Sequence, residues 1–347
     1  MKNNLKKQNA LIIGAGAFGT SMASVVANNF EKVVLLVRAD DVYQGIKNKK
    51  ENTVYLPGEK LADNIFPAKT YEEAELLVSN SFSLIISGLP TEAIRLYFKA
   101  HQHTLLHYLK RGVPLVSLTK GIDTDTLEMV DDLLFDIFPE HREQFCFLSG
   151  PSFAKEIMEE QITLVSVAGR SKKNLELVTQ MLATNYFKAL PTYDIKGLLL
   201  GGALKNVLAI AGGVLEGLGY NHNTRAAMIT RGISEMLRFG KVFNARPETF
   251  YGLSGMGDLI LTTTGEISRN KLFGLEIAKG RNPKEIINSQ RTVVEGYKTT
   301  KAAYDLSIRY DIHSNIFHGA YDVLYRNAPP REVITKIMNI PAKFELD

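Results

Sequence analysis

Apolar runs alternate with amphipathic stretches along the first half of the chain. Seven runs rich in Val, Ile and Leu predict β-strands, and they read ALII (10–13), KVVLLV (32–37), SFSLIIS (81–87), VPLVSL (113–118), QFCFLS (144–149), ITLVSVAG (162–169) and YFKALP (186–191). The intervening spacing predicts helices over Phe18–Asn29, Asp40–Lys49, Glu92–His101, Thr126–Ile137, Phe153–Glu159 and Lys172–Ala183. Nearly continuous apolar strands are typical of a parallel sheet buried on both faces. The alternation predicts a doubly wound, mostly parallel α/β domain.

The pattern changes after Pro191. Runs of β-branched residues become rare, and helical periodicity replaces them, for example in Asn223–Phe239. We therefore expect an α/β domain over residues 1–191 and a mostly α-helical domain over residues 192–347. The length of 347 residues agrees, because one hydrophobic core rarely serves so long a chain.

Composition and charge narrow the possible partners. Hydrophobic residues make up 45% of the chain and charged residues 22%, which is ordinary for a globular protein. The 41 basic and 37 acidic residues leave a net charge of +4. So small an excess does not indicate nucleic acid, although it suits a small anionic substrate. The seven histidines show no metal-ligand spacing, so we expect no metal site.

Cysteine use and apolar segments bear on the compartment. The single cysteine, Cys146, is expected to be a buried small hydrophobe, and no disulfide can form within the chain, which fits a reducing environment. The basic and then apolar N-terminus could pass for a secretory signal, but a strand followed by a glycine turn is the favoured interpretation. The longest apolar stretch, Gly197–Tyr220, is interrupted by Lys205, Asn206 and Glu216, so we do not expect it to span a membrane.

The first predicted strand runs directly into a glycine motif. Gly14, Gly16 and Gly19 form G-x-G-x-x-G between that strand and a helix, and another strand follows, which is the context of a dinucleotide-binding turn. Gly14 would permit the tight turn, Gly16 would let the backbone approach a pyrophosphate, and Gly19 would let helix and strand pack closely. The N–H groups of the helix N-terminus would bind the phosphates. A tight turn without a ligand is the alternative.

The end of the second strand indicates which dinucleotide is used. An acidic residue at this point usually holds a ribose 2′-hydroxyl, but the sequence reads VVLLVRAD and places Arg38 there. An arginine can accommodate the 2′-phosphate of NADP. Asp40 or Asp41 could still reach the ribose, although N-capping of the next helix is the simpler role. We therefore expect use of NADP, or of both NADP and NAD, with NADPH favoured.

Nine segments stand out in order between residue 14 and about residue 299. They are GAGAFGT, YLPGEKLADNI, SLTKGID, LSGPSFAKEI, GGALKNVLAIAGG, NTRAAMITRG, GLSGMGDLILT, SRNKLFG and VVEGYKT. This ordered set resembles the bacterial-type NAD(P)-dependent glycerol-3-phosphate dehydrogenases. The resemblance implies a Rossmann-like N-terminal domain followed by an all-α domain. It also implies reduction of dihydroxyacetone phosphate to sn-glycerol 3-phosphate for phospholipid synthesis, a cytoplasmic location and a homodimer.

The resemblance also implies site residues. Lys205 in ALKN matches the family's catalytic lysine. The implied substrate contacts are Lys120, Gly150, Ser152, Asp258, Ser268, Arg269 and Asn270. The implied cofactor contacts are Gly14, Gly16, Ala17, Phe18, Gly19, Arg38, Lys120, Ala154, Arg269, Val293 and Glu295. Two departures from the family pattern, the pair Gly201–Gly202 and the lack of a cysteine after LILT, touch no reacting group.

The chemistry gives these residues a physical reason. Hydride delivery to a ketone leaves negative charge on its oxygen, so a proton donor is needed there. Burial of Lys205 in an apolar helix would lower its pKa toward neutrality, and a second cation at Lys120 would act in the same direction. The guanidinium in SRN suits bidentate recognition of a phosphate. For Lys205 the alternative is a lysine whose ammonium reaches water. For the SRN segment the alternative is an ordinary polar helix cap with an exposed arginine.

Two other functions compete with this interpretation. Another Rossmann reductase of a small keto or hydroxy acid would account for the glycine turn and Lys205, but not for SRN in this context. A non-catalytic nicotinamide-sensing module would need no buried lysine and neither Asp258 nor Asn270.

Overall fold

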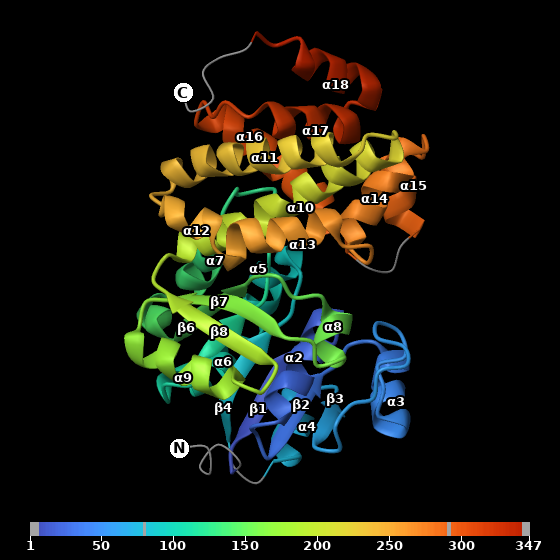
Figure 1. Ribbon diagram of the computed structural model, residues 1–347. Coiled ribbons are helices and arrows are strands. Elements are labelled where there is room, and N and C mark those ends of the chain that lie inside the picture. Colours follow the sequence, from blue (N-terminus) through green and yellow to red (C-terminus); the bar gives the residue numbers. More distant parts are fainter. Residues whose placement is uncertain (1–6, 79–80, 290–292, 342–347) are drawn as a thin grey trace. The chain divides into compact units, whose positions relative to one another are not determined.

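The computed structural model describes residues 7–78, 81–289 and 293–341, which form two compact units (Figure 1). The first unit comprises Met1–Lys120 and Glu128–Leu199, and the second comprises Gly121–Leu127 and Leu200–Asp347. The boundary that we expect at residue 191 stays a prediction.

The first unit is built on one eight-stranded sheet with the order β3-β2-β1-β4-β5-β6-β7-β8. Its strands are β1 (Asn9–Ile13), β2 (Lys32–Leu36), β3 (Ile65–Ala68), β4 (Phe82–Ser87), β5 (Leu115–Ser117), β6 (Phe145–Ser149), β7 (Thr163–Gly169) and β8 (Phe187–Thr192). Neighbouring strands are parallel except β6 and β7, which pair antiparallel. The order 3-2-1-4-5-6 is that of the Rossmann fold, so the expected mostly parallel, doubly wound sheet is confirmed.

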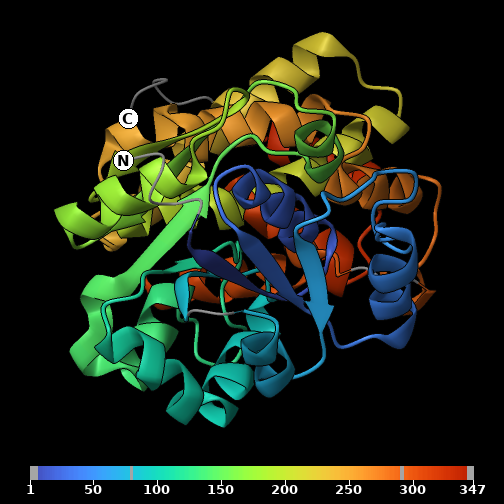
Figure 2. The ribbon, with the colours of Figure 1, turned by 90° about the horizontal axis from the view of Figure 1, so that it is seen from below.

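Strand β3 was not expected from the sequence. Its four residues, IFPA, include Pro67, which cannot donate a hydrogen bond to a ladder. The strand is tolerated because it is the edge strand of the sheet (Figure 2). Among the described residues its one strand partner is β2, and Pro67 stands opposite Leu35 in that pairing. This strand brings a further lysine, Lys69, to the edge of the sheet where β2 ends.

Helices flank the sheet and bury its faces. They are α2 (Ala17–Ala27), α3 (Asp40–Lys49), α4 (Tyr71–Leu76), α5 (Thr91–Ala100), α6 (Gln102–Lys110), α7 (Val130–Ile137), the 3-10 helix η1 (Pro139–Gln144), α8 (Ala154–Met158) and α9 (Lys172–Leu182). The helix expected from Thr126 begins only at Val130, because Leu127 adopts a φ of 63°, which interrupts an α-helix. Cys146 lies buried in the core formed by strands and helices, as expected.

The second unit is helical, which confirms the expected α-helical C-terminal region. Its elements are α10 (Ile195–Gly217, whose first residues belong to the first unit), α11 (His222–Val242), α12 (Pro247–Tyr251), the π-helical turn η2 (Leu253–Gly257), α13 (Asp258–Thr264), α14 (Arg269–Ala278), α15 (Pro283–Ser289), α16 (Glu295–Arg309), α17 (Asn315–Tyr325) and α18 (Pro330–Met338).

Helix α10 is the core of this unit, and its glycines explain how neighbours approach it. A Cβ on Gly201 would lie 2.6 Å from the carbonyl oxygen of Ser254, and one on Gly213 would lie 2.1 Å from that of Lys271. On the opposing helix α14, a Cβ on Gly274 would lie 2.1 Å from the Ile210 oxygen. The backbones therefore touch at these points. Helix α10 is long and apolar enough to cross a membrane, but 89% of its most apolar window is buried inside the protein, as in a core helix.

Candidate active site

The glycine turn has the geometry that each glycine was expected to provide. Gly14 has a φ of 99°, which favours glycine, and its N–H donates to the carbonyl of Leu36 at 3.3 Å. A Cβ on Gly19 would lie 2.1 Å from the Gly14 oxygen, so only glycine fits there. Gly16, the N-cap of α2, has nothing within 4 Å of a Cβ position. The backbone at Gly16 is therefore open to a ligand, and the turn fits a pyrophosphate at the helix N-terminus.

Two further residues hold this turn, and the sequence pattern did not single them out. The buried side chain of Asn52 donates to the carbonyl of Ala15 at 2.9 Å and to the hydroxyl of Thr20 at 2.8 Å. Gly88 follows β4, and a Cβ there would lie 3.2 Å from the Cα of Gly19. Since β4 pairs with β1, Gly88 lies where the strand order reverses, the point at which doubly wound sheets bind ligands. Asn52 lies 37 residues from Ala15 and 32 residues from Thr20, so no local sequence pattern links it to the turn.

Lys120, Phe18 and Gly150 come together in the first unit. The Lys120 ammonium donates to the Gly150 carbonyl at 3.1 Å and lies 5.5 Å from the centre of the Phe18 ring. The Ser152 hydroxyl donates to the same carbonyl at 2.8 Å. Gly150 has a φ of 149°, and a Cβ there would lie 2.9 Å from the Cα of Val165, so this position also requires glycine.

The remaining dinucleotide candidates of the first unit lie on helix ends. Ala17 and Ala154 are the first residues of α2 and α8, and these two helices contact one another. Ala154 is half-buried, as are Ala17 and Phe18. The structure thus brings together Phe18, Lys120 and Gly150, and it places Ala154 on the helix that packs against α2.

Arg38 is exposed just beyond the end of β2. Helix α3 begins at Asp40, and its N-cap is Ala39, which makes no side-chain cap. The N-cap role suggested for Asp40 or Asp41 is therefore wrong, because both lie in the first helical turn. There their carboxylates still complement the helix dipole. Asp40 forms an ion pair with Lys69 at 2.5 Å.

In the second unit, Lys205 is buried beside a carboxylate. Its ammonium lies 3.0 Å from Oδ1 of Asp258 and donates to the hydroxyl of Thr262 at 2.7 Å. Lys205 is 7% exposed and Asp258 2%, so water does not screen the pair. Thr262 in turn donates to the Asp258 carbonyl at 2.6 Å. Lys205 therefore does not extend its head to water.

The charge balance at Lys205 has two opposing causes. Burial disfavours an ammonium, as argued from the sequence, whereas a carboxylate at 3.0 Å favours it. Asp258 thus gives the ammonium of Lys205 a buried ionic partner, and the hydroxyl of Thr262 fixes the direction of the side chain. The lowered pKa of Lys205 expected from burial alone stays a prediction.

A chain of amides begins at the residue next to Lys205. The side chain of Asn270 donates to Oδ1 of Asn206 at 2.9 Å, and its own oxygen accepts from the N–H of Gly296 at 3.1 Å. A Cβ on Gly296 would lie 2.7 Å from the Asn206 carbonyl oxygen, so helix α16 approaches α10 closely there. Glu295 is the first residue of α16, and Val293, two residues earlier, is 38% exposed. Asn270 therefore links Gly296, at the end of the VVEG segment, to helix α10, which carries Lys205.

Ser268 and Arg269 differ in their surroundings. Ser268 is buried and caps α14, because its hydroxyl accepts from the N–H of Lys271 at 3.3 Å. Arg269, the first residue of that helix, is exposed. Ser268 therefore acts as the polar helix cap that was the alternative to a substrate contact. The exposed side chain of Arg269 is accessible to a ligand.

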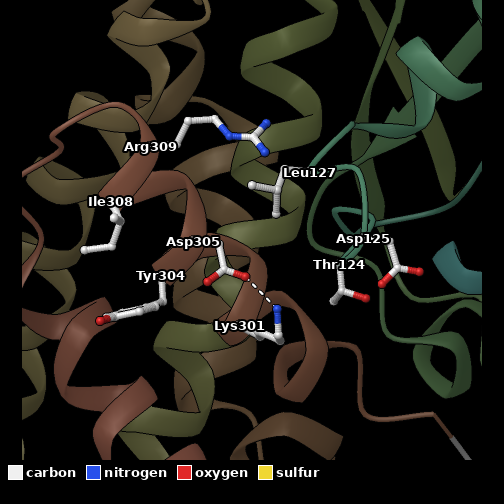
Figure 3. A pocket seen from close by; sticks show the side chains of 8 residues that line it. All are labelled: Thr124, Asp125, Leu127, Lys301, Tyr304, Asp305, Ile308 and Arg309. Carbon is white, nitrogen blue, oxygen red and sulfur yellow. Dashed lines mark hydrogen bonds and ion pairs between the residues drawn. The ribbon is translucent and has the colours of Figure 1, made fainter.

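The second unit also has a surface pocket that contains none of the predicted site residues. Its volume is about 480 Å³, and Figure 3 shows Lys301 and Asp305 turned toward one another inside it. Their ion pair is 2.6 Å long. Thr124 and Asp125 also line the pocket, and they belong to the segment Gly121–Leu127 of the same unit. Because its lysine is already paired within the pocket, we assign it no part in the site.

The sheet, its glycine turn and the buried lysine pair define a class: an oxidoreductase that binds a nicotinamide dinucleotide on a Rossmann unit and carries a helical second unit. The comparisons with known proteins narrow the class. Residues 9–175 match the NAD-dependent glycerol-3-phosphate dehydrogenase N-terminus, and residues 194–335 match the corresponding C-terminus. The chain belongs to the NAD-dependent glycerol-3-phosphate dehydrogenase family.

Individual relatives agree with this assignment. A glycerol-3-phosphate dehydrogenase (NAD(P)+) of Geobacter sp. (strain M21) is 38% identical over 335 residues, which cover 96% of this chain and 98% of the relative. The crystal structure of glycerol-3-phosphate dehydrogenase from Coxiella burnetii superposes with a TM-score of 0.87 and is 26% identical, covering 96% of this chain and 99% of that one.

A more distant likeness concerns the fold alone. The 2-dehydropantoate 2-reductase from Geobacter metallireducens has a TM-score of 0.53 and 13% identity, with 92% of this chain and 100% of that chain covered. The competing kind of reductase therefore has a similar fold, and at 13% identity the likeness says nothing about function.

Proposed function

We propose that this protein reduces dihydroxyacetone phosphate to sn-glycerol 3-phosphate with NADPH or NADH, and that Lys205 is the general acid. The observation that carries the proposal is the buried ammonium of Lys205, held by Asp258 and Thr262 in a chain of this family. When bound, the nicotinamide cofactor supplies the hydride. The protein must then supply the proton and the binding of the phosphate.

Lys205 has the properties of that proton donor. Its ammonium carries a proton at Nζ, and a ketone oxygen that gains negative charge is a stronger base than the ketone, so the proton passes to it. Asp258 remains ionised and stabilises the ammonium before the transfer. In the reverse direction the neutral amine accepts the hydroxyl proton.

We assign the substrate phosphate to the N-terminus of α14. Arg269 is exposed there, and its guanidinium can bind a phosphate in a bidentate manner. Ser268 supports this role by capping the helix, and Asn270 by fixing the helix against Asn206. Lys120, Gly150, Ser152 and Asp258 are proposed as further substrate contacts.

We assign the pyrophosphate and the adenosine end of the dinucleotide to the first unit. The open backbone at Gly16 receives the pyrophosphate, with Gly14 and Gly19 shaping the turn. Close to this turn lie Phe18, Lys120 over the Phe18 ring, and Ala154 on the helix that packs against α2. Arg38, just beyond the end of β2, favours NADPH. Ala17, Arg269, Val293 and Glu295 are proposed as the remaining cofactor contacts.

The cellular role follows from the reaction. The product is the backbone precursor of glycerophospholipids, and we propose a cytoplasmic homodimer that supplies it. The single cysteine and the burial of the long apolar helix α10 support an intracellular location. Sedimentation of the purified chain would test the dimer.

The experiment for the activity is the loss of absorbance at 340 nm with NADPH and dihydroxyacetone phosphate. We expect turnover with this ketone, little with unphosphorylated dihydroxyacetone, and none with ketopantoate. Turnover of ketopantoate would favour the other reductase, and binding of NADPH without turnover of any ketone would favour a sensing module.

A further inference from the structure

A second cation stands beside Arg38, at the end of a strand that the sequence did not reveal. Leu36 and Ala68 are partners in the β2–β3 register, and the N–H of Val37 donates to the Ala68 carbonyl at 2.9 Å. Arg38 follows β2 by two residues and Lys69 follows β3 by one, and because the two strands pair in parallel, both residues lie at the same edge of the sheet. Doubly wound sheets bind ligands outside the carboxyl ends of their strands.

Lys69 is held in place at this edge. Its ammonium lies 2.5 Å from Oδ1 of Asp40, 3.4 Å from the Arg38 carbonyl oxygen and 5.0 Å from the centre of the Tyr43 ring. Its backbone N–H donates to the carboxylate of Glu73 at 2.7 Å, which fixes the turn that follows β3. The lysine head is therefore positioned, before any ligand arrives, by the Arg38 carbonyl that follows β2 and by Asp40 and Tyr43 of α3.

Asp40, by contrast, is almost fully accessible. Its side chain is 89% exposed, whereas that of Lys69 is 26% exposed. An ion pair with so exposed a carboxylate is weak, because water and salt screen it. A ligand anion can therefore replace Asp40 as the partner of Lys69 at little cost.

We propose that Lys69 and Asp40 select between the two dinucleotides together with Arg38, an inference that rests on the proposed nicotinamide-dependent function. A 2′-phosphate takes Lys69 and Arg38 as its two cationic partners and displaces the Asp40 carboxylate by like-charge repulsion. A ribose with a free 2′-hydroxyl instead uses Asp40 as an acceptor, while Lys69 stays paired with Asp40. The exchangeable pair thus lets one site take both dinucleotides.

The test measures equilibrium binding rather than turnover. Titration calorimetry gives the Kd of the wild type and of each variant for NADPH and NADH, and for adenosine 2′,5′-bisphosphate and AMP as probes of the adenosine end. Lys69→Met keeps the apolar stem over Tyr43 and removes the charge. Loss of one charge-assisted contact is expected to raise its Kd for NADPH on the order of ten-fold and to leave the Kd for NADH within about two-fold.

Asp40→Asn should act in the opposite direction. It removes the anion that competes for Lys69, so we expect tighter binding of NADPH and weaker binding of NADH. Lys69→Arg keeps the charge and should keep the wild-type ratio of the two Kd values. Lys172→Gln is the matched control, since Lys172 is an exposed lysine in an ion pair with Glu176 at 3.8 Å on helix α9, away from β2 and β3 in the sheet order.

The outcomes separate this inference from the proposed function. An unchanged ratio of NADPH to NADH binding in both Lys69→Met and Asp40→Asn overturns the selector while leaving the enzyme assignment intact. Equal weakening of both cofactors by Lys69→Met, together with a lower melting temperature, shows that Lys69 only supports the fold. Failure of the wild type to bind either dinucleotide overturns the selector and the proposed function together.

Discussion

The ammonium of Lys205 lies 3.0 Å from the carboxylate of Asp258, and both side chains are buried in the helical unit. The two residues come from α10 and from the first turn of α13. The pair therefore lies where water is largely excluded.

Replacing Lys205 by Ala should remove the proton donor and lower kcat by on the order of 10²-fold or more, the usual scale for a positioned acid. Binding of NADPH should be retained, as measured by calorimetry. Lys271→Met is the matched control, because Lys271 is also a buried lysine of this unit and is paired with Glu216 at 3.1 Å. Near-normal turnover by Lys205→Ala, or an equal loss in Lys271→Met, would end the assignment.

Removing Asp258 alone should destabilise the protein, since it leaves a buried ammonium without its carboxylate. Breaking a buried pair costs about 3–5 kcal/mol, which corresponds to a fall in melting temperature of about 5–10 °C for Asp258→Ala. The double variant Lys205→Met/Asp258→Leu should recover most of this loss, because no unpaired charge remains. Equal melting temperatures of the single and double variants would show that the pair does not govern stability.

The glycines of the first turn should separate binding from stability. Alanine at Gly16 meets no atom within 4 Å, so Gly16→Ala should melt like the wild type yet bind NADPH poorly, because its methyl group occupies the approach to the backbone. Alanine at Gly19 would place a Cβ 2.1 Å from the Gly14 oxygen, so Gly19→Ala should lower the melting temperature as well. Calorimetry and thermal unfolding distinguish the two. Normal NADPH binding by Gly16→Ala would place the pyrophosphate elsewhere.

Arg269→Ala should reduce kcat/KM for dihydroxyacetone phosphate severely. Binding energy from a remote phosphate can orient the carbonyl, so kcat should fall as well as KM rise. The rate with unphosphorylated dihydroxyacetone should change little, since that ketone lacks the contact. Equal harm to both ketones at saturating cofactor would assign Arg269 to the cofactor or to the fold.

Glu235 should make stability depend on pH. Its carboxylate is buried on α11 and accepts from the N–H of Ile316 at 3.0 Å at the start of α17. Burial raises the pKa of Glu235 to about 7, although the backbone N–H groups of Ile316 and Phe317 act to lower it. Because the folded pKa exceeds the unfolded one, the stabilisation is complete below about pH 4.5 and is lost as the pH rises through about 7.

The comparison of wild type with Glu235→Gln isolates this effect from other titrating groups. The free energy of unfolding of the wild type relative to the variant should fall by about 3 kcal/mol between pH 4.5 and pH 8, as measured by urea denaturation. A constant difference across that range would mean that Glu235 does not change its protonation there.

The sequence by itself determined the class of fold and much of the chemistry. Local patterns carried this information: apolar strands alternating with helices predict the sheet, and the spacing of Gly14, Gly16 and Gly19 predicts the turn that the structure shows. Helix α3 has the predicted bounds, because its apolar spacing is local to ten residues. Strand β3 escaped prediction, since Pro67 is unfavourable in any strand except one at an edge.

Only the tertiary structure decided which distant side chains meet. Lys205 and Asp258, Asn206 and Asn270, and Asn52 and the glycine turn are each far apart in sequence, so no periodicity could pair them. The tertiary structure adds a partner that the sequence did not show: burial alone disfavours the ammonium of Lys205, whereas the Asp258 carboxylate at 3.0 Å favours it. In the same way, the β2–β3 register brought Lys69 beside Arg38. Charges act through space, and the fold sets the distances over which they act.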